Sequence, residues 1–325
     1  MTKKKLIYVT PDNTWIRRRK QGTQYQYLDA RGFMIHKPSL LKRWAELAIP
    51  PAYENVLICP QSNGHIQAVG YDQRKRRQYV YHKDWVQLQT TQKFDRVVAF
   101  GQALPHLRRT VQRHLRQKAF TKEKVLAAMV KIMDETNLRV GNAEYAKAHQ
   151  TFGLTTLRRR HIRVRGCQVL FQFKGKNDTP WEVTLKNNAV SKTIKKCAEL
   201  PGHQLFKYAD EAGEIHTLCS EDFNAYLKTV MADDFTAKDF RTWAASRDLF
   251  WALVQAPANT IAERKTQLTQ AIKTVAHKMG HTVAICKSSY VYPPLITAYL
   301  KGDLAHWAQK KSKKNPEQLL LKWWC

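Results

Sequence analysis

Acidic residues are scarce in this sequence. Asp and Glu together number 26 among 325 residues, against 55 Lys and Arg, which gives a formal net charge of +29. A folded chain with so much charge of one sign repels itself, and the usual partner that offsets this repulsion is a polyanion such as DNA, RNA or anionic lipid. Because 43% of the residues are hydrophobic, the chain can form real cores and is not a disordered basic tail.

Long apolar runs are also missing. No stretch approaches the roughly 18 consecutive apolar residues that a membrane-spanning helix needs. The first residues carry three lysines but have neither the apolar segment nor the cleavage site of a secretory signal. We therefore expect nucleic acid as the partner, no membrane association, and a cytoplasmic location, associated with the nucleoid if the source is bacterial.

Motifs for metals, cofactors and nucleotides are lacking as well. The six cysteines form no CxxC pair, and no Cys/His spacing matches a zinc site, so we expect reduced, ordinary thiols. No GxxxxGK[ST] segment supports ATP hydrolysis, and no cluster of carboxylates suggests a two-metal nuclease site. The sequence therefore predicts no metal and no cofactor.

Short apolar runs and turn residues fill the first part of the chain. Residues 56–59, 66–69 and 78–81 read as strands separated by turn dipeptides, and only residues 40–47 have a helical pattern. This pattern predicts a small, mostly β N-terminal domain over residues 1–92.

From about residue 93 the apolar spacing becomes that of helices. Residues 97–115 and 122–135 show it most clearly. Alternation returns within residues 162–185, where three short strands and two turns predict an antiparallel meander. We expect an α+β protein whose second domain, residues 93–325, is mainly α-helical and contains this three-stranded antiparallel sheet.

Basic residues gather in dense runs at 17–20, 74–77 and 158–165. Phosphate contacts need positive charge but no fixed spacing, so such runs bind a duplex without selecting its sequence. Tyr79 and Tyr81 share one face of a predicted strand beside the second run. They either reach base edges in a groove or are half-exposed strand tyrosines, and the sequence leaves both readings open.

The residue types present suit phosphoryl transfer without a metal. That reaction needs an oxygen nucleophile, cations directed at the nonbridging oxygens, and an acid for the leaving oxygen. Tyrosine, arginine, histidine and lysine supply all of these groups. Arginine forks match pairs of phosphate oxygens and stay charged at any working pH.

Six segments carry a resemblance to a known family. They are Leu47-Ala-Ile-Pro-Pro-Ala-Tyr53, the segment from Gly70 to Tyr81, Leu138-Arg-Val-Gly-Asn142, Phe171-Gln-Phe-Lys-Gly-Lys176, the segment from Thr236 to Trp243, and the segment from Gly280 to Val291. Any one of them is weak evidence. Together, in order and at approximately matching spacing over nearly the whole chain, they resemble the type IB DNA topoisomerases, especially the compact poxvirus and bacterial forms.

The resemblance assigns five catalytic roles. Tyr290 matches the family nucleophile, which forms a 3′-phosphotyrosyl link, and Arg139 and Arg241 match the two arginines that hold the nonbridging oxygens. Lys176 matches the hairpin lysine that protonates the leaving 5′-oxygen. His281, nine residues before Tyr290, stands where the family has a histidine or asparagine that donates to the phosphate.

Further residues match the family's DNA contacts or compete for a role. The DNA-contacting candidates are Gln78, Tyr79, Tyr81, Arg76, Arg77 and Tyr145. Lys174 is a rival for the general acid because it lies on the same strand face, two residues from Lys176. Tyr292 is a rival nucleophile.

The resemblance implies an ATP- and metal-independent topoisomerase. It would relax supercoiled duplex DNA through transient cleavage of one strand, rotation and religation. We expect a monomer with duplex DNA as its partner and no obligate protein partner, in which residues 1–92 form a DNA clamp and residues 93–325 are catalytic. The alternatives are a tyrosine recombinase, whose usual His-x-x-Arg pattern is broken here by Lys238, and a non-catalytic DNA-binding protein.

Overall fold

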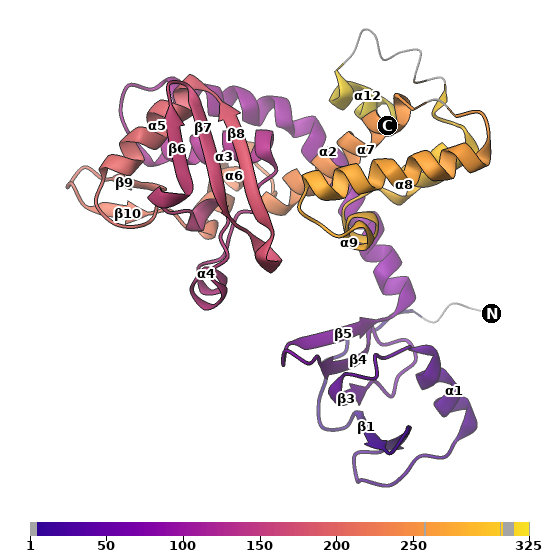
Figure 1. The fold of residues 1–325 in the computed structure, drawn as a ribbon. Helices are drawn as coiled ribbons and strands as arrows, with labels where there is room; N and C mark the ends of the chain where they lie inside the picture. Colours follow the sequence, from indigo (N-terminus) through magenta and orange to yellow (C-terminus); the bar gives the residue numbers. More distant parts are fainter. Residues whose placement is uncertain (1–4, 257, 306, 308–314, 325) are drawn as a thin grey trace. The chain divides into compact units, whose positions relative to one another are not determined.

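The computed structural model describes residues 5–256, 258–305, 307 and 315–324 (Figure 1). The chain divides into two compact units, Met1–Phe94 and Asp95–Cys325. The five cysteines within the described ranges are free thiols, and Cys325 lies outside those ranges. No helix within the described ranges is long and apolar enough to cross a membrane.

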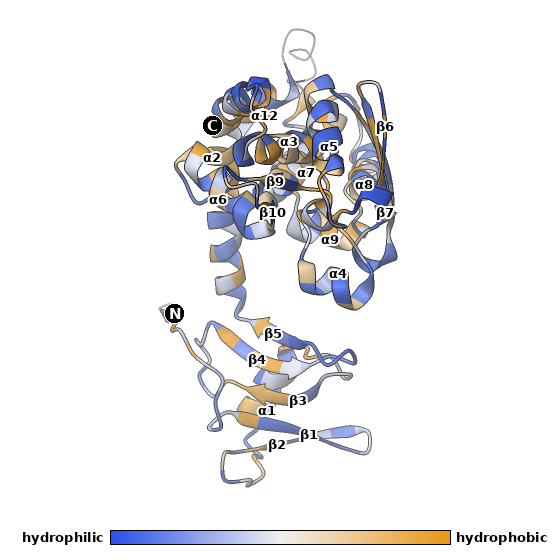
Figure 2. Ribbon diagram, turned by 90° about the vertical axis from the view of Figure 1, so that its left-hand side faces the viewer, coloured by the Kyte–Doolittle hydropathy of each residue, from blue (hydrophilic) through white to orange (hydrophobic). Residues whose placement is uncertain are grey.

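The first unit is built on one antiparallel sheet with strand order β2-β1-β3-β4-β5. Its elements are β1 (Ile16–Gln21), β2 (Gln24–Leu28), α1 (Pro38–Glu46), β3 (Glu54–Ile58), β4 (Ile66–Tyr71) and β5 (Arg77–Tyr81). Trp44 of α1 packs with Val56, Ile58 and Ala68 to form the main core. In Figure 2, β1 is mostly hydrophilic, in keeping with its Arg-Arg-Arg-Lys sequence.

Arg18 of β1 contributes to the fold of the first unit. Its guanidinium donates to the carbonyl oxygens of Ile49 (3.0 Å), Pro50 (3.0 Å) and Tyr53 (3.1 Å). These contacts hold the loop that contains the Ile-Pro-Pro segment. One member of the first basic run therefore stabilises the protein itself rather than extending into solvent.

The second unit is mainly helical and contains a small sheet with order β6-β7-β8. The helices are α2 (Lys83–Arg116), which begins in the first unit, α3 (Lys122–Thr136), α4 (Ala143–His149), α5 (Asn188–Glu199), α6 (Ser220–Met231), α7 (Ala237–Val254), α8 (Ile261–Lys278), α9 (Val283–Ser289), α10 (Pro293–Lys301) and α12 (Pro316–Trp324). The strands are β6 (Ile162–Arg165), β7 (Gln168–Lys174), β8 (Pro180–Lys186), β9 (Lys207–Ala209) and β10 (Ile215–Thr217). The predicted fold class, including the three-stranded antiparallel meander, is confirmed.

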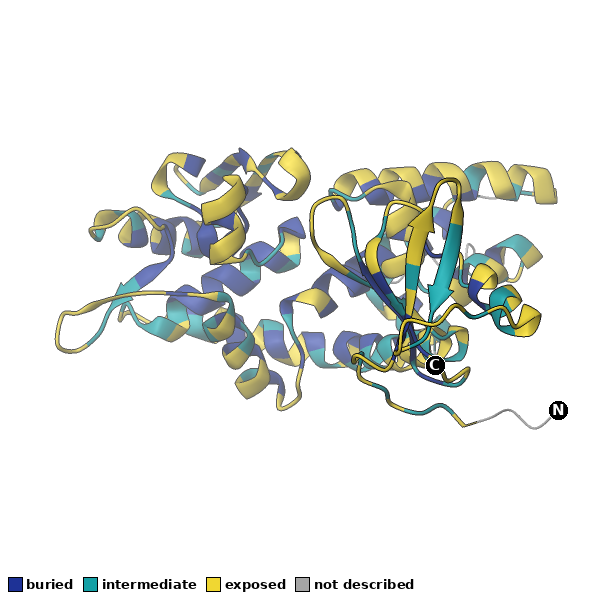
Figure 3. Cartoon of the chain, turned by 90° about the horizontal axis from the view of Figure 1, so that it is seen from below, coloured by how far each residue is buried: buried dark blue, intermediate teal, exposed yellow. Residues whose placement is uncertain are grey.

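Two central helices form much of the core of the second unit. Nine side chains of α3 and thirteen of α7 are buried, and Figure 3 shows dark blue, buried segments running through this unit. Trp243 of α7 packs so closely on Gly101 of α2 that a Cβ at Gly101 would lie 2.3 Å from the indole. This packing holds α7, and Arg241 within it, in a fixed position.

One predicted helix boundary is wrong. The apolar spacing predicts a helix from residue 97, but α2 begins at Lys83. Residues 83–93 are mostly exposed and polar, so they have no apolar stripe to show the helical period. Asp84 in the first turn of the helix is favourable to its dipole.

Candidate active site

Arg139 lies in the turn that follows α3. The helix ends at Asn137, whose φ of 57° is left-handed and reverses the chain. Arg139 Nη2 then donates to the carbonyl oxygen of Gly280 at 2.9 Å, across 141 residues of sequence. Burial lowers the pKa of the Arg139 guanidinium, and the nearby Tyr290 phenol opposes this shift.

Arg241 projects from the second turn of α7, near its N-terminus. Thr236 begins this helix, and its backbone N donates to the Asp239 carboxylate at 2.8 Å, so the predicted capping box is present. The Arg241 side chain is only 4% exposed. It donates to the carbonyl oxygens of Asn137 and Met279, and its Nη2 lies 2.6 Å from His281 Nε2.

Tyr290 and His281 face each other across α9. Gly280, with a φ of +61°, ends the preceding helical segment and turns the chain into His281. The His281 and Tyr290 rings stack with centroids 4.0 Å apart and an interplanar angle of 25°. The Arg241 guanidinium carbon lies 5.8 Å from the Tyr290 ring centroid. Ser246 Oγ donates to the Tyr290 carbonyl at 3.2 Å, which fixes the backbone at this residue.

Lys176 occupies the turn between β7 and β8. Asn177 and Asp178 in this turn both have positive φ, and the Lys176 side chain is exposed. Lys176 Nζ lies 5.9 Å from the ring centroid of Tyr145 in α4. Lys174 belongs to β7 itself, where its carbonyl accepts from Phe152 N at 2.7 Å.

Two hollows meet at these residues. One, of about 320 Å³, is lined by Arg139, Tyr145, Lys176, Arg241 and Tyr290 among others. A second, of about 760 Å³, also includes Arg139, Lys176 and Tyr290, and adds His281. The structure therefore brings together all five residues predicted to be catalytic, and places Tyr145 beside them.

Unsatisfied donors converge at this site. Four buried side-chain nitrogens in the described part of the chain have no hydrogen-bond partner, and three of them are Arg139 Nη1, Arg241 Nε and His281 Nδ1. Burying a donor without a partner is costly, and such groups are rare in folded proteins unless they serve a ligand. Because Arg241 donates to His281 Nε2, the proton of a neutral imidazole stands on Nδ1. All three nitrogens are therefore donors, as an oxyanion requires.

Positive charge dominates the electrostatics of the hollows. Burial lowers the pKa of His281 to about 3, and the charges of Arg241, Arg139 and Lys176 lower it further in the same direction. Burial and the charge of Arg139 likewise lower the pKa of Arg241, yet an arginine stays cationic at any working pH. The site therefore holds a neutral histidine between two fixed cations.

Trp181 of β8 packs between two segments that carry site residues. A Cβ on Gly175, next to Lys176, would lie 2.6 Å from the Trp181 indole, and a Cβ on Gly280, next to His281, would lie 2.7 Å from it. Only glycine allows such close approach at both positions. The indole thus sets the spacing between the β7–β8 hairpin and the turn before His281.

The rival nucleophile has a different environment. The Tyr292 ring stacks on Trp324 of α12 with centroids 4.3 Å apart. Tyr292 also contacts Trp323 edge-on at 6.0 Å. The histidine and arginine contacts described above belong to Tyr290, which favours Tyr290 as the reacting residue.

The remaining candidates lie on or near β5 in the first unit. Tyr79 and Tyr81 are 41% and 43% exposed, and their rings stack with centroids 5.8 Å apart. The Arg77 guanidinium carbon lies 5.4 Å from the Tyr79 ring centroid. Gln78 faces the other side of β5, and both Gln78 (3.0 Å) and Arg76 (2.6 Å) bind the Asp72 carboxylate. The aromatic and cationic face therefore consists of Arg77, Tyr79 and Tyr81, without Gln78.

Comparison with known proteins identifies the family. The family model described as eukaryotic DNA topoisomerase I, catalytic core, matches residues 82–311, and the one described as bacterial DNA topoisomerase IB, N-terminal domain, matches residues 24–72. A DNA topoisomerase 1B of Acanthamoeba polyphaga mimivirus is 32% identical over 286 residues, which cover 85% of this chain and 84% of the relative. The chain belongs to the type IB DNA topoisomerases.

Other topoisomerases are more distant. The DNA topoisomerase 1B of vaccinia virus (strain Copenhagen) is 24% identical over 227 residues, 69% of each chain. The DNA topoisomerase 1 of Schizosaccharomyces pombe is 27% identical over 174 residues, which cover 52% of this chain and 20% of the relative. The resemblance drawn from the six segments is confirmed. As a type IB topoisomerase, the protein relaxes duplex DNA by breaking and rejoining one strand.

Some features of this topoisomerase site have no sequence signal. The carbonyl acceptors of Arg241 come from Asn137 and Met279, far along the chain, and Ser246 reaches the Tyr290 backbone from α7. Each pairing depends on tertiary packing, which no local spacing shows.

Proposed function

We propose that Tyr290 is the nucleophile of this topoisomerase. Its phenolic oxygen attacks the scissile phosphorus, the bond to the 5′-oxygen breaks, and the products are a 3′-phosphotyrosyl ester and a 5′-hydroxyl. In religation the 5′-hydroxyl attacks the same phosphorus and releases Tyr290. One phosphoester replaces another at each step, so neither direction needs ATP.

The remaining groups have matched roles in this proposal. Arg139, Arg241 and His281 donate to the nonbridging oxygens, where negative charge grows in the transition state. The positive charge of Arg241 near the Tyr290 ring also stabilises the phenolate that forms during attack. Lys176 gives a proton to the leaving 5′-oxygen.

The observation that carries the proposal is the convergence of Arg139 Nη1, Arg241 Nε and His281 Nδ1 as buried donors beside Tyr290. A phosphate would accept from all three and remove the cost of burying them unpaired. The donors are protein cations and an imidazole, so the charge of a phosphorane can be neutralised without a metal ion. We therefore also propose metal- and ATP-independent relaxation.

We extend the proposal to the DNA contacts and the working unit. The Arg77, Tyr79 and Tyr81 face would contact the duplex as part of a clamp formed by residues 1–92, with Tyr145 as a contact beside the catalytic domain of residues 93–325. Gln78 and Arg76 would reach DNA only after leaving Asp72. We propose a monomer, since one site cuts one strand, acting where its DNA lies: the cytoplasm, on the nucleoid, if the cell is bacterial.

Relaxation of a supercoiled plasmid tests the proposal. The wild-type protein is incubated with plasmid in EDTA without ATP, and parallel samples are stopped with detergent to trap protein on a duplex labelled at the 5′ end of the cut strand. We expect relaxation and a labelled adduct for wild type and Tyr292→Phe, and neither for Tyr290→Phe. An adduct formed by Tyr290→Phe would refute the nucleophile assignment, and loss of relaxation in EDTA would refute metal independence.

A further inference from the structure

The C-terminal helix α12 contacts the segment that carries Tyr290. Tyr290 terminates α9, and its backbone is no longer helical, with φ −128° and ψ −26°. The direction of its side chain therefore depends on what holds the residues that follow. Val291 is fully buried, and the next ring, Tyr292, stacks on Trp324 at 4.3 Å and 28°.

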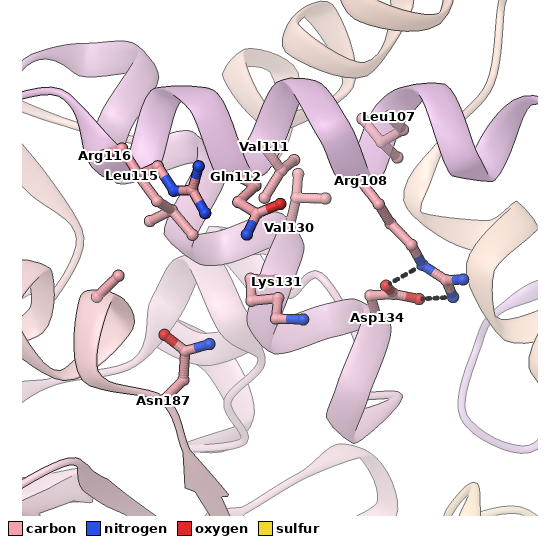
Figure 4. Close-up of a pocket in the computed structure, with 11 residues that line it drawn as sticks. Leu107, Arg108, Val111, Gln112, Leu115, Arg116, Val130, Lys131, Asp134 and Asn187 are labelled. Carbon is pink, nitrogen blue, oxygen red and sulfur yellow. Dashed lines mark hydrogen bonds and ion pairs between the residues drawn. The ribbon is translucent and has the colours of Figure 1, made fainter.

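The other end of α12 is held by an ion cluster. Arg108 of α2 donates to both oxygens of Glu317, at 2.6 and 2.9 Å, and Arg247 of α7 donates at 3.1 Å. Arg108 also pairs with Asp134 of α3 through two bonds of 2.7 and 2.9 Å (Figure 4). Glu317 thereby joins α12 to helices that form the core of the unit.

The two contacts lie on one side of the same helix. Glu317, Leu320 and Trp324 are spaced by three and four residues, so they share a face. Leu320, between the two contacts, is fully buried. The helix therefore spans roughly 10 Å from the carboxylate to the indole as a rigid element held at both ends.

We propose that α12 positions the nucleophile, with Trp324 acting through Tyr292 as the positioning residue. This inference rests on the proposed role of Tyr290. Ser246 holds the Tyr290 carbonyl from one side, and the Tyr292–Trp324 stack holds the chain two residues later. Together they fix the backbone from which the phenol must point at phosphorus in line with the leaving oxygen. A displacement of about 1 Å in such a group costs roughly 100-fold in rate.

Single-turnover cleavage tests the inference. Enzyme in excess is mixed with a duplex in which the fragment downstream of the cut, which carries the new 5′-hydroxyl, is short enough to diffuse away after cleavage. Adduct formation is timed, and DNA affinity is measured separately by fluorescence anisotropy. We expect Trp324→Ala to slow cleavage by about 10- to 100-fold with the DNA dissociation constant changed less than about twofold. Trp324→Phe keeps a stacking ring and should restore most of the rate.

A matched control and a second variant separate positioning from folding. Trp251 of α7 is also half-buried, and within the described residues its ring contacts neither Tyr292 nor Trp324, so Trp251→Ala should cleave at nearly the wild-type rate. Tyr292→Leu removes the same stack from the other side. If the two residues act through their contact, the double variant with Trp324→Ala is no slower than the slower single variant.

Several results would overturn the inference. These are wild-type cleavage by Trp324→Ala, an equal slowing by Trp251→Ala, or multiplicative effects in the double variant. If Trp324→Ala does not fold, the single-turnover cleavage rates of Tyr292→Leu and Trp324→Phe test the inference instead: Tyr292→Leu should be slow and Trp324→Phe close to wild type. An adduct on Tyr290→Phe would instead show that the nucleophile assignment is wrong, so the two failures are distinguishable.

Discussion

Replacing Glu317 with glutamine should destabilise the catalytic unit by an amount that the structure allows us to work out. The Glu317 side chain is 15% exposed and accepts from Arg108, Arg247 and Trp243 Nε1. These partners overcome the opposing effect of burial and lower its pKa from 4.5 to about 2. At about 1.4 kcal/mol per pKa unit, that shift corresponds to roughly 3 kcal/mol of stability at neutral pH.

The sign of this contribution fixes its pH dependence. A carboxyl group with a lowered folded-state pKa contributes fully above its unfolded value of 4.5 and loses the contribution as pH falls toward 2. We therefore expect Glu317→Gln to lose about 3 kcal/mol of unfolding free energy at pH 7, equivalent to roughly 6–12 °C in Tm. The gap between variant and wild type should narrow steadily below pH 4.5.

Urea denaturation at pH 7, 5 and 3.5 measures the difference in unfolding free energy between Glu317→Gln and wild type, which we call the gap. Glu211→Gln makes the same chemical change at an exposed turn residue and should stay within about 0.5 kcal/mol of wild type. The reasoning is refuted if Glu317→Gln matches wild type at pH 7, or if the gap is as large at pH 3.5 as at pH 7. The second result would assign the loss to packing rather than to charge.

Three further predictions concern the active site and the DNA contacts. Lys176→Ala should slow cleavage of an ordinary phosphodiester, and its cleavage rate should recover on a duplex in which sulfur replaces the leaving 5′-oxygen, because a thiolate leaves without a proton. Lys174→Ala should cleave both duplexes at the wild-type rate, and the reverse pattern would make Lys174 the acid. In the DNA-free enzyme His281 has a pKa of about 3, against about 6.5 in the unfolded chain, so the free energy of unfolding falls as pH drops from 6.5 toward 3. Urea denaturation over this range should show a smaller decrease in unfolding free energy for His281→Asn than for wild type. Tyr79→Ala and Tyr81→Ala should reduce cleavage at preferred sites more than overall DNA affinity, and unchanged site maps would leave these residues as strand tyrosines only.

The parts of the fold that the sequence predicts are those with a local signature. Alternation marks the strands of the meander because one face of each is buried, and the Thr236–Asp239 capping box begins α7 as expected. The six family segments predict which residues belong to the site because each segment is recognisable from its own residues and all six occur in the family's order. The sequence does not predict where α2 begins, because an exposed polar helix has no periodic apolar residues.

The parts that the sequence does not predict depend on contacts between distant elements. Tyr292 reads as a second tyrosine beside Tyr290 until the stack with Trp324 is seen. The sequence does not show that strand pleating turns Gln78 away from Tyr79 and toward Asp72, and its contact with DNA stays a prediction. In both cases the residue type is compatible with several environments, and packing selects one of them.

The position of Trp181 implies a constraint on how this sequence can change. The indole fits only because residues 175 and 280 have no side chain, and Gly280 in addition needs its left-handed backbone. These three positions should therefore vary together: a relative with a side chain at either glycine position would need a smaller residue at position 181. Substitution of Gly175 alone would act at a distance, since the displaced indole would press on the turn before His281. Lys176 and His281, the proposed general acid and phosphate donor, would then move apart through mutation of a residue that has no chemistry of its own.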